Sequence, residues 1–72
     1  MSALKKTKQD VVSEFRSAEI VGVARKVFAR KGFHDATVDE IAETAGLAKG
    51  TVYVYFRSKR SLYLALHQGI LP

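Results

Sequence analysis

The segment of residues 37–60, TVDEIAETAGLAKGTVYVYFRSKR, constrains the fold of this chain more than any other part. Thr37 and Glu40 have the S/T-x-x-E spacing of a capping box, in which two side chains satisfy free backbone N–H groups at the start of a helix. Gly46 is suited to end that helix, because glycine enters the left-handed conformation without steric cost. Leu47 then places an apolar side chain in the turn. The pattern predicts a short helix followed by a tight turn.

A second short helix is expected at about residues 49–56. Val52 and Phe56 lie one turn apart and define its buried face. Ala48, the residue before this helix, is a poor N-cap because it has no side-chain acceptor. Two short helices joined by a glycine-containing turn, with a longer helix before them, are typical of the helix-turn-helix unit.

The longer helix before this unit is clear over residues 17–31. Its apolar side chains follow the i, i+4, i+7, i+8 spacing of one helix face, and they are Ile20, Ala24, Val27 and Phe28. The start of the helix is open between about Ser17 and about Asp10, and the earlier start would have Thr7 or Ser13 as its cap.

A fourth helix is expected after the unit, with Ser58 as its N-cap and an end near Gln68. Leu62 and Leu66 form its stripe toward the domain. Further apolar residues surround the rest of the helix: Tyr63, Leu64, Ala65, Ile70 and Leu71. A helix at the edge of a three-helix core needs only one apolar stripe. The surplus predicts that this helix packs against something outside these residues.

The predicted fold is therefore all-α: a three-helix helix-turn-helix domain of the homeodomain-like kind, plus the start of a fourth, linking helix. The 72 residues are enough for one small domain. We divide them into a flexible basic N-terminal arm (1–15), the helix-turn-helix domain (16–58) and the start of helix four (59–72).

Positive charge is clustered in the second half of the motif. The net charge is +5, and residues 44–72 hold four basic residues and no acidic one. Clustered positive charge is typical of a protein that binds a polyanion. The chain has no cysteine, which excludes a disulfide framework and cysteine-ligated zinc. It has neither the ~20-residue apolar run of a transmembrane helix nor a signal-peptide pattern. We therefore expect a soluble cytoplasmic protein.

The exposed side of the second short helix carries residues suited to DNA. With Val52 buried, Lys49 and Tyr53 form one exposed row and Thr51 and Tyr55 another. Lysine can donate to guanine O6 or N7, and threonine offers a hydroxyl to phosphate and a methyl group to thymine. Tyrosine hydroxyls reach phosphate oxygens. These residues predict a helix that lies in a DNA groove.

Three further residues complete the expected interface. Gly50 has no side chain, so the backbone can come close to the groove floor. Thr37 presents a hydroxyl and a positive helix terminus toward a phosphate. Lys59, at the start of the fourth helix, is expected to hold a phosphate on the other side.

Two motifs at fixed spacing make the chain similar to a known family. They are R-x-x-x-I-x-x-x-A-x-x-x-F-x-x-x-G-F at residues 16–33 and T-V-x-x-I-A-x-x-A-G-L-x-K-G-T-V-Y-x-Y-F-x-S-K-x-x-L at residues 37–62. Over about residues 16–66 the chain resembles the N-terminal DNA-binding domain of TetR-family transcriptional regulators. The resemblance implies that four residues lie at or near base edges: Lys49, Gly50, Thr51 and Tyr53. It implies that three others hold phosphates: Thr37, Tyr55 and Lys59.

The resemblance also implies partners and a mode of regulation. Proteins similar to this one are usually homodimeric repressors that bind a palindromic operator in double-stranded DNA. They release it when a small-molecule effector binds a C-terminal helical domain. That domain is absent from these residues, so we expect the chain to be a fragment of a longer protein. Ala48 departs from the family pattern, which commonly has serine there, so one phosphate or capping contact is expected to be missing.

Two other function classes are weaker on the sequence. A basic amphipathic module that binds a membrane or a protein partner is the alternative, suggested by the charge of residues 44–72 and the apolar fourth helix. An enzyme is not expected, because no Ser/His/Asp set, metal-ligand cluster or phosphate-binding glycine loop is present. His34 and His67 have no ligand partner nearby in sequence, so we assign no catalytic residue, metal or cofactor.

Overall fold

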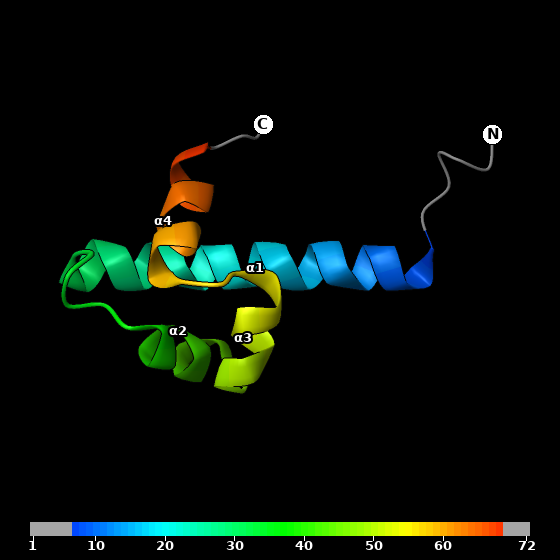
Figure 1. Cartoon of the computed structure of the whole chain (residues 1–72), viewed down its shortest axis with the longest axis horizontal. Coiled ribbons are helices and arrows are strands. Elements are labelled where there is room, and N and C mark those ends of the chain that lie inside the picture. Colours follow the sequence, from blue (N-terminus) through cyan, green and yellow to red (C-terminus); the bar gives the residue numbers. More distant parts are fainter. Residues whose placement is uncertain (1–6, 69–72) are drawn as a thin grey trace.

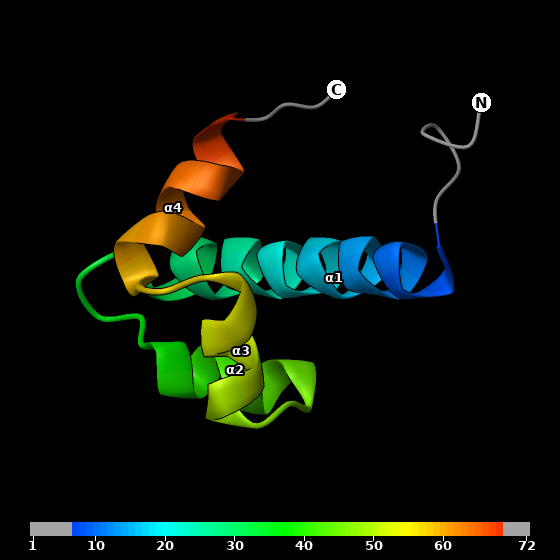
Figure 2. The ribbon, with the colours of Figure 1, turned by 45° about the vertical axis from the view of Figure 1, so that its right-hand side comes forward.

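Four helices follow one another in residues 7–68, the part of the chain that the computed structural model describes. They are α1 (Lys8–Lys31), α2 (Val38–Ala45), α3 (Lys49–Tyr55) and α4 (Lys59–Gln68). All the regular secondary structure of the described part is helical, which confirms the all-α prediction. Helix α1 forms the long axis of the structure, with α2 and α3 on one side of it and α4 on the other (Figure 1). It packs against α2 and α4, and α2 in turn packs against α3 (Figure 2).

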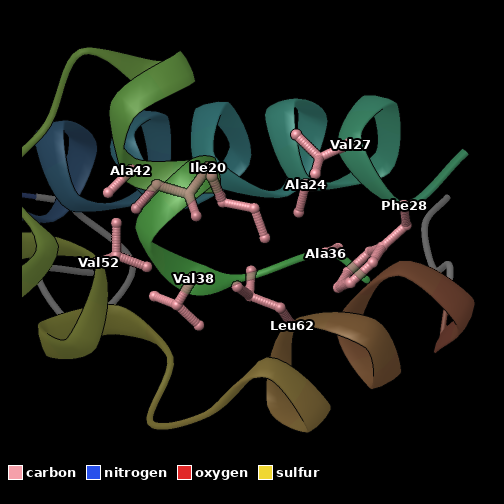
Figure 3. Packing of buried hydrophobic residues seen from close by; sticks show 10 residues of the cluster. Ile20, Ala24, Val27, Phe28, Ala36, Val38, Ala42, Val52 and Leu62 are labelled. Atoms are coloured by element: carbon pink, nitrogen blue, oxygen red, sulfur yellow. The ribbon is translucent and has the colours of Figure 1, made fainter. Parts of the chain in front are cut away.

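A single core lies where these helices meet. Every helix and the α1–α2 loop contribute at least one residue to it (Figure 3), and its members are Ile20, Ala24, Val27, Phe28, Ala36, Val38, Ile41, Ala42, Val52 and Leu62. The four residues of α1 in this set are those whose spacing predicted its buried face. Val52 is the contribution of α3, and Leu62 is that of α4; both are fully buried. Burial of a branched apolar side chain is worth roughly 1.5–3 kcal/mol, so this core holds the short helices in place.

Helix α1 begins earlier than our domain division assumed. The arm was placed at residues 1–15, yet the helix starts at Lys8, so that boundary is wrong for residues 8–15. The cause is a complete capping box: Thr7 Oγ1 accepts the Asp10 N–H at 3.0 Å, and the Asp10 carboxylate accepts the Thr7 N–H at 3.3 Å. Residues 1–6 of the expected arm lie outside the described residues.

The turn between α2 and α3 forms as the sequence predicted. Gly46 ends α2 in the left-handed conformation, with φ 73° and ψ 31°. The Leu47 N–H donates to the Ala42 carbonyl at 2.9 Å, which is the six-to-one bond of a Schellman motif. Leu47 packs against the core from the turn. The chain therefore turns within a few residues, so that α3 crosses α2 (Figure 2).

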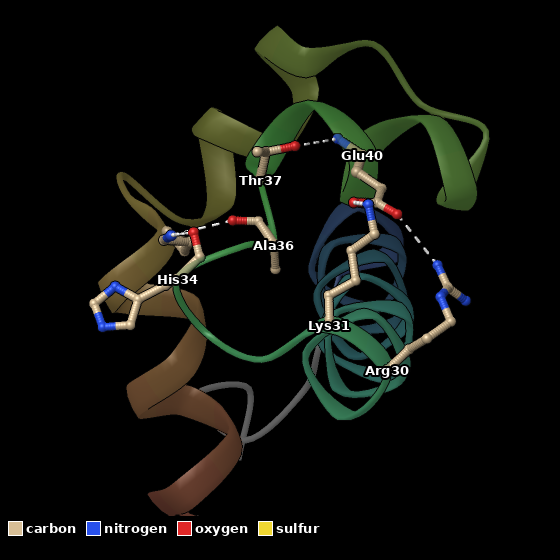
Figure 4. Close-up of polar contacts among 7 residues, drawn as sticks. Arg30, Lys31, His34, Ala36, Thr37 and Glu40 are labelled. Atoms are coloured by element: carbon tan, nitrogen blue, oxygen red, sulfur yellow. Dashed lines mark hydrogen bonds and ion pairs between the residues drawn. The ribbon is translucent and has the colours of Figure 1, made fainter.

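The start of α2 differs from the prediction in one respect. Thr37 Oγ1 accepts the Glu40 N–H at 3.0 Å, as a cap should. The Glu40 carboxylate does not complete a capping box but pairs with the end of α1 (Figure 4), at 3.0 Å from Lys31 Nζ and 3.2 Å from Arg30 Nη2. Glu40 therefore ties α2 to α1 instead of closing its own helix terminus.

The last two helices follow their local signals. Helix α3 has seven residues, and Ala48 before it makes no side-chain cap bond, as expected. Ser58 Oγ accepts the Ser61 N–H at 3.1 Å, which confirms it as the cap of α4. Leu64 on α4 is 47 % exposed, in line with the expected surplus of apolar surface; Ile70 and Leu71 lie outside the described residues. Within residues 7–68, no helix has the length and apolar character needed to cross a bilayer.

The ion pairs of Glu40 make the free energy of unfolding depend on pH. The hydrogen bond from the Lys31 ammonium is the main reason that the pKa of Glu40 lies below its ordinary value of 4.5; desolvation opposes it, and the charge of Lys31 and the Arg30 guanidinium add to the lowering. A depressed folded-state pKa contributes stability that is present above the unfolded value and is lost as the pH falls through the folded one. We expect Glu40→Gln to lower the free energy of unfolding at pH 7 and to change it less at pH 3, measured by urea denaturation. Glu43→Gln is the control for loss of one carboxylate from α2, and an equal effect of the two variants at both pH values would contradict this prediction.

Candidate nucleic-acid interface

Four of the predicted site residues meet around one shallow hollow. The hollow has a volume of about 390 Å³ and is bounded by the α1–α2 loop, the start of α2, α3 and the start of α4. Thr37, Lys49, Tyr53 and Lys59 line it. These residues are separated by up to 22 positions in the sequence, yet the crossing of α2, α3 and α4 brings them to one place. The arrangement offers hydroxyl and ammonium donors on one concave surface.

Thr37 is exposed at the rim of the hollow, next to the N-terminus of α2. Its hydroxyl oxygen accepts the Glu40 N–H, so the hydroxyl proton remains free to point elsewhere. A free O–H beside the positive end of an eight-residue helix suits an anion. Capping and anion binding are therefore compatible at this residue.

Lys49 is exposed and is held by an acidic neighbour. Its Nζ lies 2.9 Å from Asp39 Oδ1 and 5.9 Å from the centre of the Tyr53 ring. The hydrogen bond and charge of Asp39 raise the pKa of Lys49 above its ordinary value. Tyr53, one turn further along α3, is 40 % exposed with its ring on the same side. The expected exposed row of Lys49 and Tyr53 is present.

Lys59 has a different environment from the one expected of a free cation. Its ammonium donates to three backbone carbonyls of the α1–α2 loop, at 2.6 Å from Phe33 O, 3.1 Å from Ala36 O and 3.3 Å from His34 O. It also lies 4.4 Å from the centre of the Phe33 ring. An ammonium has three donors, and here all three have acceptors. Lys59 therefore ties α4 to the loop that leads into α2, and it also lines the hollow.

The second predicted row is less accessible than the first. Thr51 and Tyr55 are both half-buried, and Tyr55 packs against the core. Tyr55 does not line the hollow that holds the other residues; it faces a separate one with Asp10 and Glu14 of α1. Carboxylates near the phenol disfavour a phosphate there. The structure thus places Tyr55 apart from the residues around the hollow.

Gly50 lies exposed in the first turn of α3. A Cβ added to this glycine would meet no atom within 4 Å. Nothing in the described protein therefore requires a glycine here.

Three residues of this surface were absent from the sequence prediction. Arg57 lines the hollow from the connection between α3 and α4, and because it lies beyond the end of α3 no helical spacing could have placed it there. Val54 is 77 % exposed on α3, the largest exposure of any large apolar side chain in the described residues. Asp39 was overlooked because its partner Lys49 lies on another helix, beyond the reach of any local pattern.

The fold and this surface together define a helix-turn-helix DNA-binding domain. In residues 7–68, no group of three His, Cys, Asp or Glu side chains is arranged to hold a metal ion. Residues 20–66 match the family described as bacterial regulatory proteins, tetR family. The chain therefore belongs to this family of bacterial regulatory proteins.

Relatives with known names agree with this assignment. The HTH-type transcriptional activator FasR of Mycolicibacterium smegmatis is 43 % identical over 53 residues, which are 74 % of this chain and 24 % of that protein. The fatty acid metabolism regulator protein of Bacillus subtilis is 40 % identical over 48 residues, 67 % of this chain and 25 % of that protein. The HTH-type transcriptional repressor AcnR of Corynebacterium diphtheriae is 41 % identical over 51 residues, 71 % of this chain and 27 % of that protein.

The similarity to these relatives covers only one part of each of them. The chain spans about a quarter of the length of the curated relatives it matches. Activators and repressors both occur among them. No solved structure matches the chain significantly. Because the relatives are transcriptional regulators, the alternative of a module for membranes or protein partners is not favoured.

The Lys59 contacts give a testable consequence for stability. Lys59→Met keeps the apolar stem over Phe33 and removes the ammonium, which leaves three carbonyls without their donor. Hydrogen bonds to charged groups are worth about 1.5–3 kcal/mol, so we expect a loss of that order in the free energy of unfolding. Arg60→Met, at the exposed neighbouring position, is the matched control in the same urea titration. Equal stability of the two variants would show that the loop contacts do not hold α4.

Proposed function

We propose that α3 enters the major groove of double-stranded DNA with its N-terminal half toward the base edges. Lys49, Gly50, Thr51 and Tyr53 would lie at or near those edges, and Thr37 would hold a phosphate at the hollow. The single observation that carries the proposal is the convergence of Thr37, Lys49, Tyr53 and Lys59 around one concave surface. Donors that line a concave surface next to an exposed helix face suit a backbone phosphate beside an inserted helix.

Lys59 and Tyr55 take secondary places in this proposal. Lys59 lines the hollow, so its charge attracts a phosphate even while its protons are bound to the loop. It also fixes the loop that presents Thr37, which makes it a positioning residue as well. Tyr55 would reach a phosphate only at the opposite edge of α3, and we expect it to contribute least. Arg57 joins the proposed contacts because it is exposed and lines the hollow together with Lys49 and Tyr53.

We infer a larger assembly from the family. The parent protein would be a cytoplasmic homodimer that binds a palindromic operator, with a small-molecule effector bound in a further helical domain. Two half-sites about 34 Å apart would then supply the affinity that one domain lacks. Support for this comes from the family membership and from the relatives, of which the matched segment spans 24 % and 25 %.

A titration of the isotope-labelled chain with duplex DNA tests the interface. Backbone NMR shifts should concentrate at Thr37, at residues 49–54 and at Arg57, and should weaken as salt is added, because phosphate contacts release counterions. Lys49→Ala should relax the preference at one base-pair position by about 1–3 kcal/mol if the lysine reads a base edge. Shifts confined to α4, with none on α3, would overturn the proposed interface.

A substitution of Gly50 should have opposite effects on folding stability and on DNA binding. Gly50→Ala should stabilise the domain by up to about 1 kcal/mol, since alanine favours a helix over glycine and the new methyl group meets no neighbour. The same methyl group would stand between α3 and the groove floor, so DNA affinity should fall. Thermal unfolding and the duplex titration measure the two effects on one variant. A more stable variant that binds DNA as well as the wild type would exclude close backbone approach at this residue.

A further inference from the structure

The hollow around α3 contains one acidic side chain among the described residues that line it. Asp39, the second residue of α2, lies beside Thr37, Lys49, Tyr53 and Arg57. Its carboxylate is 2.9 Å from Lys49 Nζ. A negative charge on a surface meant for a polyanion opposes binding, so its presence calls for an explanation.

Stability does not explain this ion pair. The side chains of Asp39 and Lys49 are 69 % and 52 % exposed. Exposed pairs of this kind contribute little to folding, because water screens the charges and two flexible side chains must be ordered. By contrast, the Glu40 pairs with Lys31 and Arg30 join two helices with a partly buried carboxylate. The Asp39–Lys49 pair lies on the proposed binding face. It joins Lys49, which we expect to contact base edges, to a fixed position on α2.

The pair has two effects on Lys49. It restrains a long side chain whose ammonium otherwise rotates freely among many acceptors. It also cancels the positive charge that would draw the lysine to the nearest phosphate, which is the interaction that dominates binding to DNA of any sequence. If Asp39 holds the Lys49 ammonium in one position, the lysine adds binding free energy mainly on DNA that has a base-edge acceptor next to that position.

We propose that Asp39 is a specificity-determining residue: its carboxylate positions Lys49 Nζ for a base edge and withholds it from the phosphate backbone, so that DNA without the matching base is bound less well. The proposal rests on the DNA interface described under Proposed function. It assigns to Asp39 no contact with DNA of its own.

The test compares two duplexes of equal length. One is enriched from a randomised pool by the wild-type chain at low salt, and the other has a random sequence. Asp39→Asn keeps the size of the side chain and removes its charge. We expect the variant to bind the random duplex several-fold more tightly at low salt, with a log–log salt slope steeper by about 0.9, because one more phosphate is neutralised. The ratio of affinities for the enriched and random duplexes should fall by roughly tenfold, the size of one base contact.

Two further variants make the result specific. Glu43→Gln removes one carboxylate from α2 a single turn away, and no ion pair of Glu43 occurs among the described residues. It should raise affinity for both duplexes alike and leave their ratio unchanged; a drop in the ratio equal to that of Asp39→Asn would overturn the proposal. In a Lys49→Ala background, Asp39→Asn should no longer change the ratio. A change that persists there would mean that the carboxylate acts on DNA directly and would equally overturn it.

The outcomes separate this proposal from the interface on which it rests. If the wild-type chain shows no salt-dependent binding to either duplex, the interface fails and the role of Asp39 with it. If the wild type binds and prefers the enriched duplex, but Asp39→Asn changes both affinities by the same factor, the interface stands and the role of Asp39 is refuted.

Discussion

The placement of α3 depends on the burial of one side chain. A helix of seven residues does not persist alone in water, because nucleation is costly and few backbone bonds repay it. Val52 is its fully buried residue, and the preceding turn adds Leu47 to the same core. Because Val52 is fixed, the direction of every other side chain on α3 follows from helix geometry. Lys49 and Tyr53 point outward since Val52 points inward.

Signals that act over a few residues made the helix-turn-helix predictable. The Thr37 cap, the left-handed Gly46 and the buried face of α1 each depend on neighbours within about one or two turns, so their residue types suffice to find them. The first exposed row of α3 followed from the same local geometry. The family motif extended the prediction to the order of all four helices.

Contacts between segments far apart in the sequence could not be predicted from local patterns. Lys59 reaches carbonyls that lie 23 to 26 positions away, and the sequence does not say how α4 crosses the α1–α2 loop. Glu40 had the spacing of a capping box, but two cations at the end of α1 offer its carboxylate a stronger electrostatic interaction. Tyr55 was expected on an open row and instead packs against the core, since the first half of α1 passes beside it. Each difference changes which donors are free to meet DNA.

Helix α1 is continuous, but only its second half packs buried side chains into the core. All four of its buried residues lie from Ile20 onward, and its first half instead exposes Val11, Val12 and Phe15, the last of them by 69 %. The first three turns therefore have no fully buried apolar side chain, and local contacts such as the Thr7–Asp10 cap and the Arg16–Glu19 pair support them. Local opening costs least where few apolar contacts must be broken. Amide protons before Ile20 should consequently exchange with solvent through fraying of the helix, while those around Ala24 and Val27 exchange only when the whole domain unfolds.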